Sequence, residues 1–202
     1  IIRDIPEGPE MVFVEGGRFI MGSDDNENSK PIHPVTIPSF WMGKYPVTFE
    51  EYDTFCTQTG KGKPRDEGWG RSRMPVININ WEDAQSYCKW LSEKTGQRYR
   101  VPSEAEWEFA AKGGKIDLAV GEGVGEPGFQ YSGSNYLENV GWNRGNSGSK
   151  THPVGEKKAN DLGLHDLSGN VYEWCKDAWH KNYNNAPADG SAWEGNKESV
   201  RV

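Results

Sequence analysis

The chain has few cysteines, no long hydrophobic run and no concentration of basic residues, and each absence argues against a class of function. Its three cysteines, Cys56, Cys88 and Cys175, include no Cys-x-x-Cys pair, which disfavours zinc and allows at most one intramolecular disulfide. No apolar stretch approaches the roughly 20 residues of a membrane-spanning helix. The formal net charge is -7 and the basic residues are scattered, unlike a surface that follows phosphates. We expect no nucleic-acid partner and no membrane span.

Glycine, proline and tryptophan are abundant instead. The 202 residues include Gly 25, Pro 12 and Trp 9, while only 34% of the chain is hydrophobic. This composition favours irregular loops held by large aromatic anchors over a helical bundle, which needs more Leu and Ala at regular spacing. The length allows one large domain or two small ones.

Both ends of the chain look abrupt. It opens on Ile1-Ile2-Arg3-Asp4 with neither an initiator Met nor a secretory signal, which weakly favours the cytoplasm. Residues 198–202 are typical of the start of a strand. We expect residues 1–10 to be an N-terminal extension and residues 11–202 to be one domain that is incomplete at Val202.

Short strands are predicted near the N-terminus. Residues 11–22 are two apolar runs around Gly16-Gly17, which predicts a hairpin. Residues 35–43 read as a further strand and residues 99–101 as a short one. The acidic segment 24–28, between the runs 11–22 and 35–43, indicates a solvated loop.

Three helices are predicted from capping boxes, in which a side chain at the helix start binds the backbone three residues on. The pairs are Thr48 with Glu51, Asn80 with Asp83, and Ser103 with Glu106. The helices are expected to end at Gly60, Gly96 and Gly113-Gly114.

The faces of these helices suggest structural roles. Ala84, Tyr87, Cys88 and Leu91 form the apolar face of the second helix, so Cys88 is expected to be a core thiol or half of a disulfide. Glu104 and Glu106 are expected to serve the helix cap and dipole rather than catalysis. From residue 115 to residue 202 no helical period appears, and a loop region of that length usually binds a metal, ligand or partner.

Residues 163–175 combine two carboxylates with a Ser-Gly-Asn turn. Asp166 and Glu173 flank Ser168-Gly169-Asn170, whose turn exposes main-chain carbonyls, and such an oxygen-only set suits Ca²⁺. The alternative is a plain tight turn, with Asn170 in a left-handed conformation and Trp174 in the core.

Several motifs in order resemble the formylglycine-generating enzyme, or sulfatase-modifying factor, family. They are Tyr45-Pro46-Val47-Thr48, Tyr87-Cys88-x-Trp90, Arg100-Val101-Pro102-Ser103-Glu104-Ala105-Glu106-Trp107-Glu108, and Gly163-Leu164-x-Asp166-Leu167-Ser168-Gly169-Asn170-Val171-Tyr172-Glu173-Trp174. The resemblance implies an α+β, C-type lectin-like fold with two main helices, a small twisted antiparallel sheet and little regular structure.

The resemblance also implies metal sites. Asp166 and Glu173 would bind Ca²⁺ with their side chains, and the carbonyls of Gly169 and Val171 would complete the site. A second calcium site would begin at Asn139-Val140, although its downstream acidic ligand has no clear match. The family's Cu⁺-binding cysteine pair would lie beyond Val202, and the partner of Cys88 in some disulfide-bonded members would lie there too.

Departures from the enzymes favour a paralogue. Cys175 stands where the enzymes usually carry Thr, and residues 151–155 resemble bacterial paralogues, which include non-catalytic binding modules, variable proteins of diversity-generating retroelements and iron-dependent oxidases. The four histidines show no His-x-x-x-His spacing for iron.

We therefore expect a non-catalytic ligand-binding or display module stabilised by calcium, and no enzyme activity in this chain. The alternative is the scaffold of a copper-dependent oxidase that converts a protein cysteine to formylglycine. The partner would be a protein or peptide ligand, or a C-terminal fragment of the same parent protein that remains bound after cleavage.

The tryptophans divide into two groups. Trp41, Trp81, Trp90, Trp107 and Trp174 fall on expected strands and helices and are predicted to be core residues. Trp69, Trp142, Trp179 and Trp193 lie among Gly, Asn and charged residues and are candidates for a ligand surface.

Overall fold

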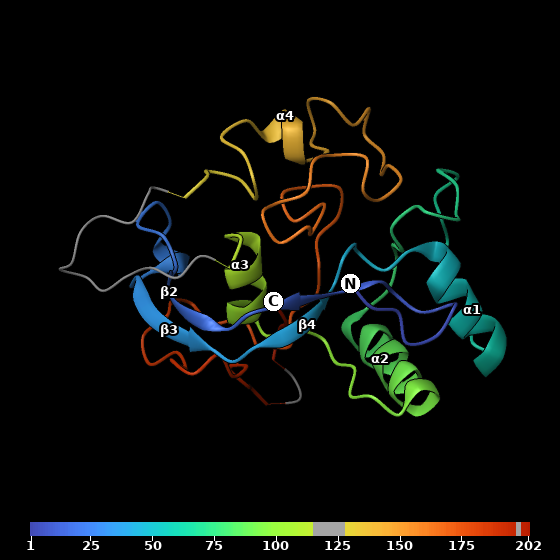
Figure 1. The fold of residues 1–202 in the computed structure, drawn as a ribbon, viewed down its shortest axis with the longest axis horizontal. Helices are drawn as coiled ribbons and strands as arrows, with labels where there is room; N and C mark the ends of the chain where they lie inside the picture. The colour runs from blue at the N-terminus through green and yellow to red at the C-terminus, as the bar shows by residue number, and fades with distance from the viewer. Residues whose placement is uncertain (115–127, 197–198) are drawn as a thin grey trace.

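The computed structural model describes residues 1–114, 128–196 and 199–202, which form short strands and helices joined by long loops (Figure 1). The strands are β1 (Met11–Val14), β2 (Gly17–Met21), β3 (His33–Ile37) and β4 (Phe40–Gly43). The helices are α1 (Phe49–Thr59), α2 (Trp81–Thr95), α3 (Glu104–Ala111) and α4 (Leu137–Val140), with one 3-10 turn, η1 (Glu27–Ser29). Few helices and small antiparallel sheets confirm the predicted fold class.

The four strands form one long antiparallel ribbon with a bend in its middle. β1 pairs with β4, from Met11 opposite Gly43 to Val14 opposite Phe40, and β2 pairs with β3. The predicted hairpin within residues 11–22 is therefore wrong. Gly16 lies at the bend instead. The opposite strand segment comes so close there that a Cβ on residue 16 would overlap the backbone of Ile37 and Ser39.

The helix boundaries follow the predicted capping signals. Both halves of the capping box are present at the start of α1, α2 and α3. Gly60 and Gly96 end α1 and α2 in the left-handed conformation, whereas α3 ends at Ala111 with Lys112 as its C-cap. The predicted strand at residues 99–101 is absent from this described segment, because the Tyr99 N–H donates to Ser92 Oγ at 2.9 Å instead of joining a ladder.

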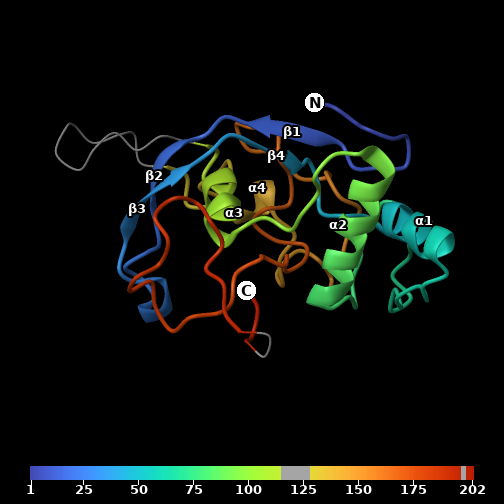
Figure 2. The same cartoon turned by 90° about the horizontal axis from the view of Figure 1, so that it is seen from below.

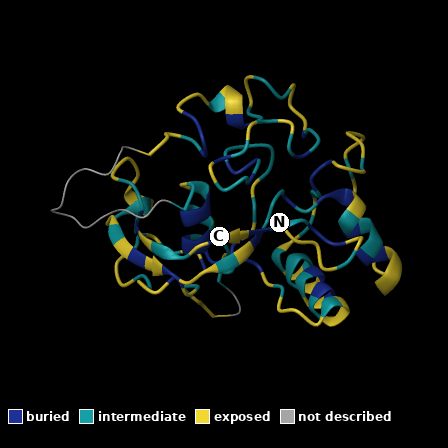
Figure 3. Cartoon of the chain, in the orientation of Figure 1, coloured by how far each residue is buried: buried dark blue, intermediate teal, exposed yellow. Residues whose placement is uncertain are grey.

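Two hydrophobic clusters lie at opposite ends of the molecule (Figures 1 and 2). In the first, α3 packs on β2 and β3, with Phe19, Phe109 and Leu164 at its centre. In the second, α1 packs on α2 through Tyr52, Phe55, Tyr87, Trp90 and Leu91. Figure 3 shows buried positions on α3 and along the inner sides of α1 and α2.

The C-terminal part consists mainly of loops. Residues 128–196 and 199–202 contain no strand, only the isolated bridges Tyr131–Ser134 and Ala178–Arg201. The expectation of no helix beyond residue 115 is wrong at α4, which is a single short helix, and it cannot be assessed over residues 115–127, which lie outside the described part. The buried Asn160 side chain fastens these loops, since Nδ2 donates to Ala110 O (2.8 Å) and Oδ1 accepts from Leu162 N and Leu164 N.

No helix in the described part of the chain is long and apolar enough to cross a membrane. Residues 1–10 fold back on β1 through two hydrogen bonds between Ile2 and Met11, of 3.0 and 2.8 Å.

Candidate functional site

The turn at residues 166–171 is held against a neighbouring loop. Asp166 and Asn170 have φ values of 63° and 67°, so both adopt the left-handed conformation, as predicted for Asn170. Asn170 N donates to Trp142 O at 2.8 Å, and its side-chain amide exchanges two hydrogen bonds with the His152 backbone. The loop around Trp142 therefore fixes the orientation of the turn.

The two predicted carboxylates are near enough for the charge of Asp166 to act on Glu173. Asp166 is only 2% exposed, and its Oδ2 accepts from Gly155 N at 2.8 Å. Its Oδ1 is buried without a hydrogen bond of good geometry, although the nearby Asn170 side chain opposes the rise that burial causes in the pKa of Asp166. Burial raises the pKa of Glu173 to about 7, and the neighbouring Asp166 charge adds to the rise. The Trp107 indole N–H opposes the rise, although its geometry falls short of a hydrogen bond.

This arrangement fits a hard cation. A buried carboxylate oxygen without a donor is costly, and two neighbouring carboxylates repel each other unless one of them is protonated or a cation neutralises them. Ca²⁺ would supply that neutralisation and cross-link the two sides of the turn. Within the described residues no three His, Cys, Asp or Glu side chains converge, so further ligands would be carbonyls and water. The Gly169 carbonyl already accepts from Val171 N at 2.9 Å and has one lone pair left.

The second predicted calcium position lies beside the first. Asn139 and Val140 belong to α4, and the following Gly141 packs so closely on Ser168 that a Cβ would overlap the Ser168 carbonyl. Here, however, Asn139 O accepts from Lys158 N at 3.0 Å, and Lys157 Nζ donates to Glu138 O at 2.9 Å. The ammonium group of Lys157 already supplies a positive charge at this segment.

A cavity of about 1320 Å³ reaches Glu173. Its walls are β4, residues 76–79, one face of α2, residues 97–102 and residues 170–174, with Glu173 in the lining. Trp41, Trp69, Tyr172 and Trp174 line it and are exposed, Tyr172 fully so. The cavity therefore opens among aromatic side chains.

Two of these aromatics were predicted to be core residues, and that prediction is wrong. Trp41 is 44% exposed because it lies on the outer face of β4, where it stacks edge-on against Phe13 of β1 with ring centroids 5.3 Å apart. Trp174 is 38% exposed and is held by its indole N–H, which donates to Ile79 O at 3.3 Å. Of the other three, Trp90 is buried, and Trp81 and Trp107 are partly buried.

The predicted surface tryptophans do not gather at one site. Trp69 lines the cavity, but Trp142, Trp179 and Trp193 are not among its lining residues in the described part of the chain. Trp142 is sandwiched between the His152 ring at 3.8 Å and the Lys157 ammonium at 4.0 Å. Trp193 stacks on His180 at 3.6 Å, and Trp179 is half exposed. Tyr172, which the sequence analysis did not single out, is the more exposed cavity residue.

The three cysteines are free thiols with raised pKa values. Cys88 lines the cavity, and burial raises its pKa to about 11, against the opposing charge of Arg100. Burial also raises the pKa values of Cys56 and Cys175. At neutral pH these groups are thiols rather than the thiolates that act as nucleophiles or metal ligands.

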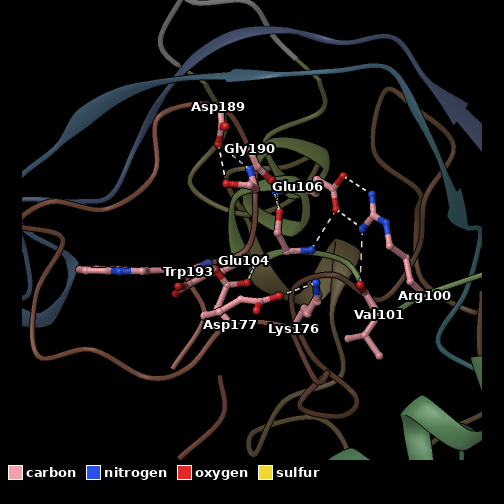
Figure 4. A network of polar contacts seen from close by, with 12 residues as sticks. Arg100, Val101, Glu104, Glu106, Lys176, Asp177, Asp189, Gly190 and Trp193 are labelled. Atoms are coloured by element: carbon pink, nitrogen blue, oxygen red, sulfur yellow. Dashed lines mark hydrogen bonds and ion pairs between the residues drawn. The ribbon is translucent and has the colours of Figure 1, made fainter. Parts of the chain in front are cut away.

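The carboxylates at the start of α3 are structural (Figure 4). Glu106 accepts from Ser103 N at 2.9 Å and forms a two-pronged ion pair with Arg100, which confirms its predicted capping role. Asp177 is buried and accepts from Glu104 N and Trp193 N, both at 2.7 Å. Glu104 lies in the first turn of α3 and accepts from Tyr183 Oη at 2.9 Å. The network joins the C-terminal loops to α3.

The chain is similar to several known proteins. The family model described as sulfatase-modifying factor enzyme 1-like domain matches residues 3–202. The structure of PvdO from Pseudomonas aeruginosa is 35% identical with a TM-score of 0.80, covering 97% of this chain and 81% of that one. Treponema denticola variable protein 1 is 27% identical with a TM-score of 0.70, covering 95% and 86%.

One curated relative is much longer. The serine/threonine-protein kinase Pkn1 of Chlamydia trachomatis is 33% identical over 204 residues, which cover 89% of this chain and 29% of Pkn1. The chain thus spans about three tenths of the length of such relatives. Because the family model matches almost all of the chain, the protein belongs to the sulfatase-modifying factor enzyme 1-like domain family.

Proposed function

We propose that the chain is a non-catalytic module, stabilised by calcium, that binds a protein or peptide ligand in the aromatic-lined cavity. The observation that carries this proposal is the cavity itself. At about 1320 Å³ it exceeds the roughly 300–1,000 Å³ of small-molecule pockets, and exposed Trp and Tyr side chains of the kind that dominate binding interfaces line it. The name of Treponema denticola variable protein 1 supports a display role for this scaffold.

The three described thiols show no sign of a copper-binding role. Cu⁺ needs soft thiolate ligands, and the three described thiols are separate, free and shifted towards their neutral form. The alternative function, the scaffold of a copper-dependent oxidase that makes formylglycine, therefore requires a cysteine pair other than Cys56, Cys88 and Cys175.

Calcium has a structural part in this proposal. Asp166 and Glu173 would hold it with the carbonyls of Gly169 and Val171, and the unpartnered Asp166 Oδ1 is the observation in its favour. Because Glu173 also lines the cavity, the ion would fix one wall of the binding site.

A peptide selection with a matched pair of variants tests the binding function. A random dodecapeptide library displayed on phage is selected against the chain in 1 mM CaCl₂, about the upper dissociation constant of extracellular calcium modules, and the enriched peptide is synthesised and titrated by calorimetry. We expect Tyr172→Ala to weaken binding about tenfold, because Tyr172 lines the cavity and is fully exposed. Tyr136→Ala, an exposed tyrosine outside the cavity, is the control and should bind normally. Failure to enrich any peptide, or equal binding by both variants, would contradict the proposal.

A further inference from the structure

The ribbon of β1 to β4 is covered on one face only. Its inner face carries buried side chains of the first hydrophobic cluster and packs on α3. Because successive side chains of a strand point to opposite faces, the outer face carries residues 13, 18, 20, 34, 36 and 41. Figure 2 shows α3 beneath the ribbon and no described helix over its outer side. The outer face is therefore available to a partner.

Apolar side chains lie in both halves of this outer face. Phe13 of β1 lies opposite Trp41 of β4, and these side chains are 49% and 44% exposed. In the other half, Ile20 of β2 lies opposite Pro34 of β3, with Pro34 exposed and Ile20 half-buried. Each half of the ribbon therefore presents one apolar cross-strand pair.

Two opposite charges lie between the apolar pairs. Glu15 directly follows β1 and Arg18 is the second residue of β2, and both are exposed. Alternation puts Glu15 on the face of Phe13 and Arg18 on the face of Ile20. Neither forms an ion pair within the described residues. The outer face thus carries, in order, an apolar pair, a negative charge, a positive charge and a second apolar pair.

This order is complementary to itself under a two-fold rotation. In a symmetric dimer every contact between two different residues is made twice, once in each direction. An axis between Glu15 and Arg18 places Glu15 of each copy against Arg18 of the other. The same rotation places the Phe13 pair against the Ile20 pair. Opposite charges and apolar groups therefore meet at all four positions.

We propose that two copies of the chain associate through the outer faces of their ribbons, with Glu15 of each copy paired to Arg18 of the other. The self-complementary charge order favours a second copy over an unrelated partner, because one face supplies both members of each pair. This dimer does not require a ligand in the cavity. Its contacts involve few side chains, so the interface is small and the association is weak and sensitive to salt.

Sedimentation velocity of the purified chain measures the association. Runs from about 10 μM to about 1 mM protein cover the dissociation constants expected of a small interface. We expect the weight-average sedimentation coefficient to rise with protein concentration in low salt. The rise should shrink in about 1 M NaCl, where charges more than about 3 Å apart are screened. A monomer at every concentration would overturn the proposal.

A pair of charge reversals tests which residues meet. Glu15→Arg and Arg18→Glu each place like charges against each other, so each variant alone should self-associate at least about tenfold more weakly. An equimolar mixture of the two variants makes both positions complementary again. The mixture should therefore associate at least as tightly as the unaltered chain.

Two further variants complete the test. Glu82→Arg, at an exposed residue of α2 outside the ribbon, changes the net charge as much as Glu15→Arg does and should associate normally. Phe13→Thr keeps a residue that suits a strand and should weaken association, because it removes an apolar contact from each end of the interface.

The outcomes decide the proposal. Association of Glu15→Arg equal to that of the unaltered chain overturns it, and so does a mixture of the two folded reversal variants that remains monomeric. Circular dichroism shows whether each variant is folded. If a reversal variant is unfolded, the salt series and Phe13→Thr decide, and association that neither of them weakens overturns the ribbon dimer.

Discussion

Asp177 shows how one buried side chain can connect distant segments. Its two oxygens accept from the first amide of α3, at Glu104, and from Trp193 in the C-terminal loops (Figure 4). Burial raises the pKa of Asp177, and these two backbone donors oppose the rise. The carboxylate is thus retained in the interior by hydrogen bonds rather than by an ion pair.

Replacing Asp177 should destabilise the protein. Asp177→Ala leaves two amides without an acceptor, at about 1–3 kcal/mol for each buried group, so we expect a loss of about 3 kcal/mol in the free energy of unfolding. Urea unfolding measures it. Asp189→Ala, which removes an exposed carboxylate that accepts from the neighbouring Ser191, should leave the midpoint unchanged. An equal effect of both substitutions would refute this role for Asp177.

Local residue patterns predicted some positions and not others. The capping pairs at Thr48, Asn80 and Ser103 were predictable, because each box is made within four consecutive residues. The exposure of Trp41 and Trp174 was not, because the face of a strand that is buried depends on which distant segment covers it.

At the scale of elements, the bend in the ribbon accounts for the misassigned hairpin. Gly16-Gly17 between two apolar runs is typical of a turn, yet the pairing of β1 with β4 and of β2 with β3 is non-local. The sequence could indicate where the backbone needs glycine but not whether the reason was a turn or a close approach.

Gly16→Ala should disturb both halves of the ribbon. Its Cβ would overlap the backbone of Ile37 and Ser39, which cannot move without shifting β3 and β4, so we expect a loss of about 1–3 kcal/mol. Thermal and urea unfolding measure it. Gly62→Ala is the control, because that position is exposed and has no neighbour within 4 Å, and it should be neutral or slightly stabilising. Normal stability of Gly16→Ala would show that the ribbon relaxes freely there.

At the scale of the whole molecule, we expect the Asp166–Glu173 pair to make stability depend on pH. In the metal-free protein Glu173 has a pKa of about 7, against 4.5 for the ordinary group. The folded state therefore binds a proton that the unfolded state has already released. The stability that Glu173 contributes is full below about pH 4.5 and is lost as the pH rises through about 7, by about 3 kcal/mol in total. The raised pKa of Asp166 acts in the same direction.

Calcium should remove this pH dependence. In EGTA we expect the melting temperature to fall between pH 5 and pH 8, and in 1 mM CaCl₂, near the weak end of protein calcium affinities, we expect it to stay level because the ion keeps both carboxylates charged. Differential scanning calorimetry at each pH provides the comparison. Asp166→Asn should lose the response to calcium. Identical curves in EGTA and calcium would rule out a cation at this pair.

The site was predictable only in part. The motif around Asp166 and Glu173 is contiguous, so the sequence alone could identify these carboxylates as candidate ligands. The cavity is assembled from β4, α2, the N-terminal segment and several loops that lie far apart in the chain, and no local pattern marks Trp41, Tyr99 and Tyr172 as lining one cavity. Such a site can be identified only from the folded structure.

The separation of the two hydrophobic clusters has a consequence for cooperativity. Met42 of the α3–ribbon cluster and Tyr87 and Leu91 of the α1–α2 cluster line the same cavity. A ligand that fills the cavity would therefore contact both clusters at once. Its binding would therefore stabilise both clusters together and raise the cooperativity with which the domain unfolds.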